Sequence, residues 1–259
     1  MEKEDILKYS QQVISYVSDT EYNVANGFFV SYCGYYYFTT ANHSITYDDI
    51  GESQLLEEIY LILHIHGQGL TTKAIKLNNW QTIDLYKVIQ TESIFPRMKL
   101  DEIEDIAFCS IYPAILKNNI VELPFRLKEA QPNSCVKKQI YSIPLSNDIA
   151  TPNIEKNYYL AGKILNGSNS YIREYVEYFY KNIKFIGMAG KFYIFQMPTN
   201  ISIENIKGLS GSPIFDSNKN CIGMAIRYRE YNNTIVVLPI EEIVYYLKND
   251  CMPDIEEES

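Results

Sequence analysis

The chain has 259 residues, of which 46% are hydrophobic and 14% aromatic, and its formal net charge is −9. This length and composition fit one large domain or two modest ones with a substantial core. No basic cluster is longer than a pair of residues, so we expect no nucleic-acid partner. No apolar run approaches the length of a membrane-spanning helix, so we expect no membrane association.

The N-terminal residues and the cysteines together predict a cytoplasmic protein. Residues 1–5 are charged, and no apolar segment typical of a secretion signal follows them. The five cysteines are odd in number and are not clustered, which favours free thiols in a reducing compartment over a disulfide framework. These cysteines are Cys33, Cys109, Cys135, Cys221 and Cys251.

The first half of the chain predicts one helix followed by a barrel. Apolar residues recur at helical spacing over residues 4–18, which predicts an N-terminal helix. From about residue 20 to 112 the pattern changes to short apolar runs, typical of about six strands. The strand candidates are 25–31, 35–41, 59–63, 72–77, 83–88 and 106–111.

The second half repeats this pattern after a proline-containing connector at residues 113–134. A second barrel is predicted over about 135–239, interrupted by an aromatic-rich inserted helix at 170–185. A closing helix at 240–248 and a solvated acidic tail at 249–259 follow. The strand candidates of this half are 136–143, 158–165, 192–197, 212–215, 221–228 and 234–237. We therefore predict an all-β fold of two six-stranded antiparallel barrels with a cleft between them.

Three residues in the order His, Asp, Ser predict nucleophilic catalysis. His43 ends an apolar run, Asp105 directly precedes another, and Ser210 lies in the glycine-flanked segment Gly208-Leu209-Ser210-Gly211-Ser212-Pro213. A serine hydroxyl becomes an effective nucleophile when a histidine takes its proton and a carboxylate orients that histidine. The sequence has only three histidines, so few such sets exist.

The order of these residues argues against other hydrolases. An α/β-hydrolase has glycine two positions after its serine, where this chain has Ser212, and its Asp and His follow the serine. A subtilisin-type order would need a catalytic carboxylate in the short N-terminal segment. His64 and His66 share one face of a predicted strand, but no third ligand accompanies them, so we expect no metal site and no cofactor.

The same segments resemble a known family. Gly27-Phe28-Phe29-Val30 with Thr40-Ala41-Asn42-His43, then Asp105-Ile106-Ala107, then the serine segment are similar to the three motifs of trypsin-like serine peptidases. The resemblance spans about residues 20–247 and is closest to the cytosolic and bacterial HtrA-type branch without a PDZ domain. It implies one chymotrypsin-like domain over residues 1–247.

This resemblance implies a serine endopeptidase that cuts a protein substrate through an acyl-enzyme. Ser210 would be the nucleophile, His43 the general base and then acid, and Asp105 the carboxylate that orients His43. Glycine at position 208 permits positive φ, and the N–H groups of Gly208 and Ser210 would form the oxyanion hole.

Comparison with the family also suggests a specificity pocket. Glu204 would lie at its floor and would favour Lys or Arg before the cut. The segment Ala225, Ile226 and Arg227 would form its wall and pair with the substrate backbone.

Leu209 differs from the digestive members of the family, which carry an aspartate directly before the nucleophile. Activation through that aspartate is therefore not expected, and control would come from ordering of the loop beside Lys207 or from a regulatory protein partner. A microbial stress or defence pathway fits such an enzyme. The alternative is a catalytically silent or latent trypsin-fold module that binds protein.

Overall fold

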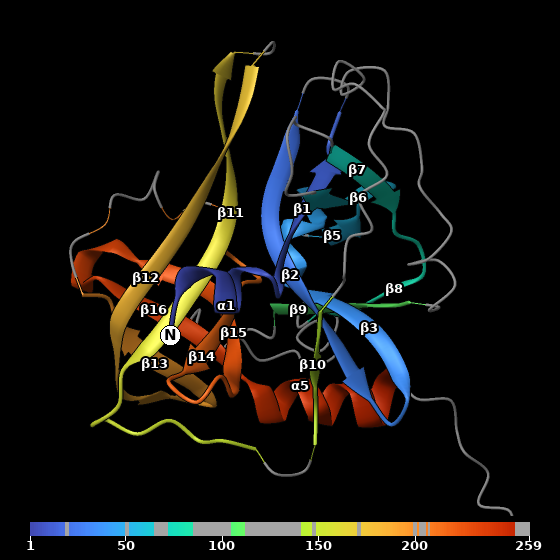
Figure 1. Ribbon diagram of the computed structural model, residues 1–259. Helices are drawn as coiled ribbons and strands as arrows, with labels where there is room; N and C mark the ends of the chain where they lie inside the picture. Colours follow the sequence, from blue (N-terminus) through green and yellow to red (C-terminus); the bar gives the residue numbers. More distant parts are fainter. Residues whose placement is uncertain are drawn as a thin grey trace, which may run out of the picture.

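Two β units lie side by side in the computed structural model, the N-terminal one in blue and green and the C-terminal one in yellow and orange (Figure 1). The structure describes residues 1–18, 21–49, 52–64, 72–84, 105–111, 141–146, 149–169, 172–198, 201, 206 and 208–251. The predicted connector and residues 252–259 of the predicted acidic tail lie outside these residues.

The N-terminal unit is a half-barrel built on one sheet in the order β7-β6-β1-β2-β3-β9-β8, with β10 parallel to β2. A separate hairpin, β4–β5, follows a short 3-10 turn at Asn42–Ser44. The elements are α1 (Lys3–Leu7), β1 (Ser10–Tyr16), β2 (Tyr22–Tyr32), β3 (Tyr35–Thr40), β4 (Thr46–Asp49), β5 (Glu52–Leu55), β6 (Glu58–His64), β7 (Thr72–Lys76), β8 (Trp80–Asp84), β9 (Asp105–Ser110) and β10 (Ser142–Pro144).

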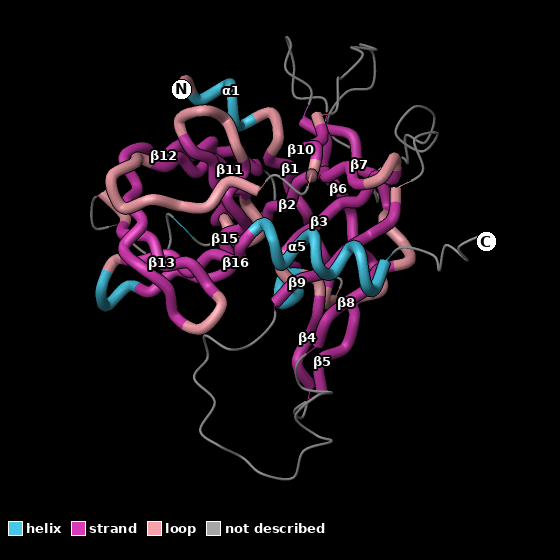
Figure 2. Tube along the Cα trace, turned by 90° about the horizontal axis from the view of Figure 1, so that it is seen from below, coloured by secondary structure: helices cyan, strands magenta, loops and turns pink. Residues whose placement is uncertain are grey.

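The C-terminal unit is a closed barrel in the order β11-β12-β13-β16-β15-β14, closed by pairing of β14 with β11. Its strands are β11 (Tyr158–Asn169), β12 (Ile172–Ala189), β13 (Phe192–Gln196), β14 (Pro213–Asp216), β15 (Cys221–Arg229) and β16 (Thr234–Pro239). After β16, α5 (Ile240–Tyr246) and a π-helical turn (Leu247–Cys251) run from the edge of the barrel across the N-terminal unit (Figure 2). No helix in the described ranges is long and apolar enough to span a bilayer.

Strands near the centre of the molecule are buried on both faces. On β2, Phe29 packs inside the half-barrel against Phe38, with ring centroids 5.1 Å apart. Its neighbours Phe28 and Val30 point the opposite way, into a cluster shared with Phe215 of the barrel and with α1 and α5. This shared cluster joins the two units through apolar contact.

The predicted all-β class and its two-barrel arrangement are confirmed, with the first unit forming a half-barrel. The closing helix is confirmed as α5. The predicted second barrel began at about residue 135, but β10 joins the N-terminal sheet instead.

The predicted helix over residues 4–18 is wrong. Only the single turn α1 is helical, and β1 pairs with both β2 and β6. Val13 packs inside the half-barrel, whereas Ile14 packs against Tyr60 on the other face. A strand with apolar residues on both faces lacks simple alternation, and its spacing therefore resembled that of a helix.

The predicted inserted helix at 170–185 is also wrong, because β12 runs through this segment and pairs with β11. Tyr178 and Tyr180 are two residues apart and stack at 6.0 Å, as side chains on one face of a strand do. Tyrosine, phenylalanine and valine are enriched in strands, which agrees with this pairing. The β11–β12 hairpin extends well beyond the barrel (Figure 1).

Candidate active site

His43 and Asp105 form a bonded pair at one end of the half-barrel. Strands β3 and β9 pair side by side, and they place the turn that carries His43 beside the first residue of β9. Asp105 Oδ2 lies 2.5 Å from His43 Nδ1, and Asp105 Oδ1 accepts the backbone N–H of His43 at 2.9 Å. The carboxylate therefore fixes both the ring and the backbone of His43, while the His43 side chain remains 52% exposed.

The pKa of Asp105 is held below its ordinary value despite burial. Burial alone would raise it, but the charge and hydrogen bonds of His43, together with the charge of Arg227, lower it. Asp105 is therefore an ionised, buried acceptor at neutral pH. Such a carboxylate favours a proton on His43 Nδ1 and stabilises the imidazolium form.

Ser210 lies in a tight loop of residues 208–212, named here the serine loop. Glycines on either side adopt positive φ, 95° at Gly208 and 85° at Gly211, which a residue with a Cβ adopts only with strain. Leu209 is buried in the barrel core and thereby anchors the loop to the barrel. Ser210 itself is partly exposed, and its Oγ donates to the carbonyl of Ile226 at 3.4 Å.

The serine loop docks onto the half-barrel beside the turn that carries His43. The N–H of Asn26 on β2 donates to the Ser210 carbonyl at 2.8 Å. A Cβ added at Gly211 would lie 1.8 Å from the Asn26 carbonyl oxygen, so only glycine permits this approach. Thr40 Oγ1 donates to that same carbonyl at 2.6 Å, and Thr40 is three residues before His43. The fold therefore brings the segments of the three predicted catalytic residues together at the junction of the two units.

The loop backbone also bears on the predicted oxyanion hole. The N–H of Leu209 donates to Ile206, and the N–H of Gly211 donates to Ala225 at 2.7 Å. In the described part of the chain, the N–H groups of Gly208 and Ser210 donate no hydrogen bond.

Ala225, Ile226 and Arg227, which the sequence predicted to form a pocket wall, lie on β15. Ala225 and Ile226 both contact the serine loop through their carbonyl oxygens. Arg227 lies near enough to Asp105 for its charge to act on the carboxylate. Glu204, Lys207 and His66 lie outside the described residues, as does the side chain of His64.

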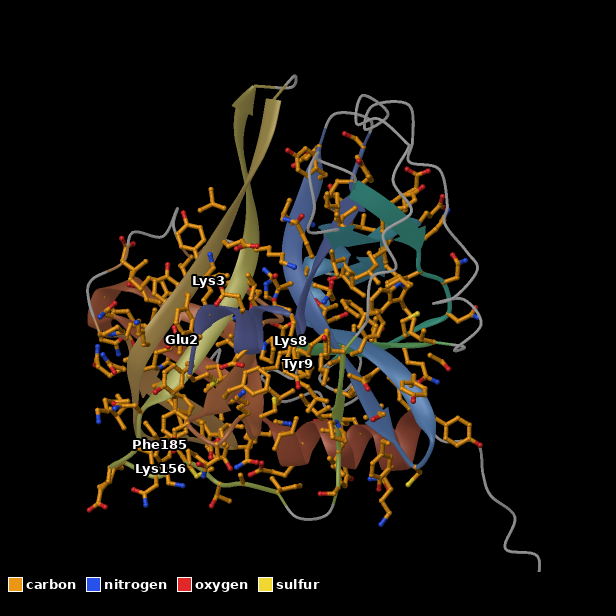
Figure 3. All side chains as sticks on the ribbon, in the orientation of Figure 1. Glu2, Lys3, Lys8, Tyr9, Lys156 and Phe185 are labelled. Atoms are coloured by element: carbon orange, nitrogen blue, oxygen red, sulfur yellow. The ribbon has the colours of Figure 1, made fainter. Side chains whose placement is uncertain are left out.

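Asn26 and Lys163 are buried polar residues at this junction that the sequence did not single out. Asn26 is 0% exposed and directly precedes the Gly27 motif, which was the only available signal. Lys163 on β11 is 2% exposed, and burial lowers its pKa to about 8 although Glu177 opposes the shift. Glu177 also pairs at 2.8 Å with Lys3 on α1, which lies against the barrel (Figure 3).

Cys33, Cys109 and Cys221 are free thiols. Cys33 is exposed in the β2–β3 turn, whereas Cys109 and Cys221 are buried. Burial raises the pKa of both buried thiols to about 12. Among the described residues, no three His, Cys, Asp or Glu side chains are arranged to hold a metal ion.

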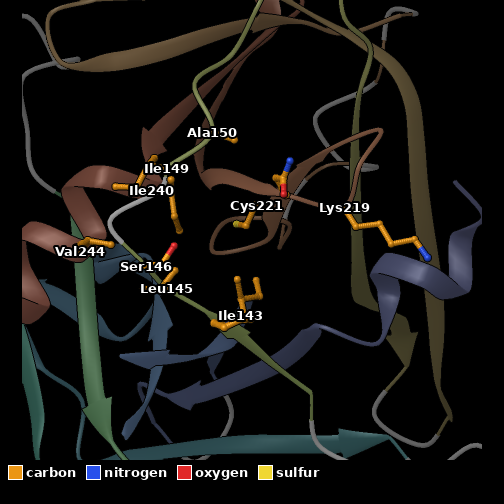
Figure 4. Close-up of a pocket in the computed structure, with 11 residues that line it drawn as sticks. Ile143, Leu145, Ser146, Ile149, Ala150, Lys219, Cys221, Ile240 and Val244 are labelled. Atoms are coloured by element: carbon orange, nitrogen blue, oxygen red, sulfur yellow. The ribbon is translucent and has the colours of Figure 1, made fainter. Parts of the chain in front are cut away.

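A cavity of about 190 Å³ lies near the start of α5, and none of the predicted catalytic residues lines it (Figure 4). Its walls are Ile143, Pro144, Leu145, Ser146, Ile149, Ala150, Lys219, Asn220, Cys221, Ile240 and Val244.

Solved structures share the fold of this chain, although its sequence matches no protein-family model and no curated protein. A protease of M. tuberculosis in its active form has a TM-score of 0.52 and 11% identity, covering 95% of this chain and 82% of that one. A thermostable serine protease from an extremophilic microorganism has a TM-score of 0.51 and 12% identity, covering 95% and 98%. The tobacco vein mottling virus protease has a TM-score of 0.51 and 10% identity, covering 96% and 86%. The chain thus has the chymotrypsin-like fold.

Proposed function

We propose that this protein is a serine endopeptidase with Ser210 as nucleophile, His43 as general base and acid, and Asp105 as the orienting carboxylate. The observation that carries the proposal is the His43–Asp105 pair, bonded through both carboxylate oxygens, beside the docked serine loop. The protease fold of the structural neighbours supports it.

The proposed reaction has two halves. His43 takes the proton of the Ser210 hydroxyl while Oγ attacks the scissile carbonyl carbon, and the carbonyl oxygen becomes an oxyanion. The N–H groups of Gly208 and Ser210 stabilise that oxyanion. The C–N bond then breaks, the leaving amine takes the proton from His43, and an acyl-enzyme remains. Water, deprotonated by His43, attacks the ester and releases the acid and free Ser210.

Serine is favoured over cysteine as the nucleophile. Position 210 carries an oxygen nucleophile, and the buried Cys109 and Cys221 stay protonated at neutral pH because their pKa values are raised to about 12. Cys33 lies in the turn before β3, whereas His43 lies after the other end of that strand.

The proposed substrate is a protein whose extended segment pairs with Ala225, Ile226 and Arg227 on β15. An acidic pocket floor at Glu204 would select Lys or Arg before the cut, and peptides varied at that position test this selection. A preference for apolar residues there would overturn it. The motif resemblance supports the HtrA-type branch. The unclustered cysteines are the basis for proposing a cytoplasmic enzyme, and Leu209 is the basis for proposing control by a protein partner.

A fluorophosphonate probe, which phosphonylates activated serines, tests the proposal. The wild-type chain should be labelled, and Ser210→Ala should abolish labelling. Ser212→Ala is a matched control, because Ser212 lies in the same loop but is fully buried and its Oγ has no hydrogen-bond partner. Folded wild-type protein that remains unlabelled would favour the protein-binding module instead.

A further inference from the structure

Asn26 occupies the junction between the half-barrel, the barrel and the serine loop. It lies on β2, is 0% exposed, and bonds through both its side chain and its backbone. Its partners come from four elements: β1, β3, β11 and the serine loop.

The side chain of Asn26 uses its full hydrogen-bonding capacity. Nδ2 donates to the carbonyl oxygens of Gly208 at 2.6 Å and Lys163 at 3.0 Å. Oδ1 accepts from Ser10 Oγ at 2.9 Å and from the N–H of Lys163 at 3.0 Å. The two bonds to Lys163 resemble a strand pairing, so they fix the plane of the amide and aim the second Nδ2 hydrogen at Gly208.

Asn26 therefore holds the serine loop at two points. Its side chain binds the carbonyl of Gly208, and its backbone N–H binds the carbonyl of Ser210. Fixing these carbonyls on either side of Leu209 restricts rotation of the peptide groups between them. The N–H of Ser210 belongs to this restrained stretch, and the N–H of Gly208 directly precedes it, on the residue whose carbonyl is fixed.

The surrounding glycines make this contact possible. A Cβ at Gly162 would lie 2.3 Å from Leu209 Cδ2 and 3.2 Å from Asn26 Nδ2. A Cβ at Gly211 would meet the Asn26 carbonyl. Both backbones approach Asn26 closely because neither carries a side chain.

We propose that Asn26 is a positioning residue that presents the N–H groups of Gly208 and Ser210 to the oxyanion and sets the serine loop against the strands that lead to His43. This proposal rests on the proposed peptidase function. Asparagine is required because two carbonyl oxygens need donors while an N–H and a hydroxyl need an acceptor. Ionised aspartate has the same shape but donates no hydrogen bond to the carbonyl oxygen of Gly208 or of Lys163.

The test compares Asn26→Asp, Ser10→Ala and Asn233→Asp by the kinetics of fluorophosphonate inactivation. Asn233 is a matched control, since it is a buried asparagine whose amide bonds Met197 and Tyr228 at the far turn of the barrel. For Asn26→Asp we expect kinact to fall by about 100-fold, the scale for a lost oxyanion donor, with KI unchanged. For Ser10→Ala, which removes one bond that orients the amide, we expect a fall of about fivefold. Asn233→Asp should keep the wild-type kinact.

Each result bears on the proposal. Wild-type kinact in folded Asn26→Asp would overturn it, and so would an equal loss in Asn233→Asp. A rise in KI with kinact unchanged would also overturn it, because oxyanion stabilisation acts on the reaction rather than on prior binding. If Asn26→Asp does not fold, Ser10→Ala decides, and an unchanged kinact there contradicts the proposal. Absence of wild-type labelling would instead refute the peptidase function.

Discussion

The half-barrel and the closed barrel hold their parts of the candidate site in different ways. In the half-barrel, Asp105 and His43 touch directly and lie at the ends of neighbouring strands. In the barrel, Ser210 is held through its backbone, by glycine conformations and by hydrogen bonds that cross to the other unit.

The two parts of the site should therefore respond differently to substitutions at the junction of the two units. The His43–Asp105 geometry depends on contacts within one unit, so changes at the junction should leave it intact. The place of Ser210 relative to that pair depends on Asn26 and Gly211, so changes at the junction should lower reactivity without breaking the pair.

The largest expected effect is the loss of Ser210 reactivity when the His43–Asp105 pair is changed. Asp105→Asn should lower the rate of Ser210 phosphonylation by about 10⁴-fold, because the amide favours the wrong tautomer of His43. Adding His43→Ala to this variant should lower the rate little further, since the residues act as a unit. The rate constants for labelling measure both effects, and additive losses would contradict a shared role.

A smaller effect is expected at the junction. Gly211→Ala should lower stability by more than the ~1–2 kcal/mol of a left-handed alanine, because its Cβ meets the Asn26 carbonyl. Gly190→Ala is the matched control, with positive φ but nothing within 4 Å of the added Cβ. Denaturant unfolding of both variants measures the difference, and equal losses would show that the close approach is unimportant.

Removing the buried charge of Lys163, on the barrel side of the junction, should stabilise the folded protein. Burial lowers the pKa of Lys163 to about 8, so below pH 8 the folded state carries an unfavourable charge. Lys163→Met should therefore stabilise the protein at pH 7 by up to about 3 kcal/mol.

The stability difference between Lys163→Met and the wild type should shrink as pH rises from about 8 towards the ordinary pKa of lysine. In this range the unfolded wild type binds more protons than the folded wild type, so the wild type becomes more stable as pH rises. Unfolding at several pH values measures this difference, and Lys184→Met on the exposed part of β12 serves as the control. A gain that does not vary with pH would contradict the explanation.

The smallest effect concerns the link between α1 and the barrel. A hydrogen bond from Lys219, 2.8 Å away, lowers the pKa of Asp5. Lys219→Ala should raise the pKa of Asp5 and leave Ser210 labelling unchanged. An NMR titration of Asp5 measures the first result, and loss of labelling would show that α1 influences the site.

Local sequence signals identified many of the strands and the catalytic candidates but not their three-dimensional partners. His43, Asp105 and Ser210 each lie at or near the end of a strand within a short motif, so they could be proposed as a catalytic set. Asn26 could not be proposed, because its partners lie as far away as residues 163 and 208 and no local pattern records such contacts.

The two wrong helices have a related cause. β1 has apolar side chains on both faces: Val13 packs inside the half-barrel, and Ile14 packs against Tyr60 on the other face. In β12, Tyr178 and Tyr180 share one strand face, but Phe179 between them interrupts simple alternation, so the segment resembled an amphipathic helix. Burial on two sides comes from tertiary structure, so periodicity alone does not distinguish these cases.

The most direct test of a catalytic unit assembled across the two halves is mass-spectrometric mapping of the fluorophosphonate adduct in the wild type and in His43→Ala. Mapping matters because the chain has 23 tyrosines, which are alternative hydroxyl nucleophiles. We expect the adduct on Ser210 in the wild type and only background labelling in folded His43→Ala. An adduct elsewhere, or equal labelling of Ser210 in both proteins, would contradict the proposed active site.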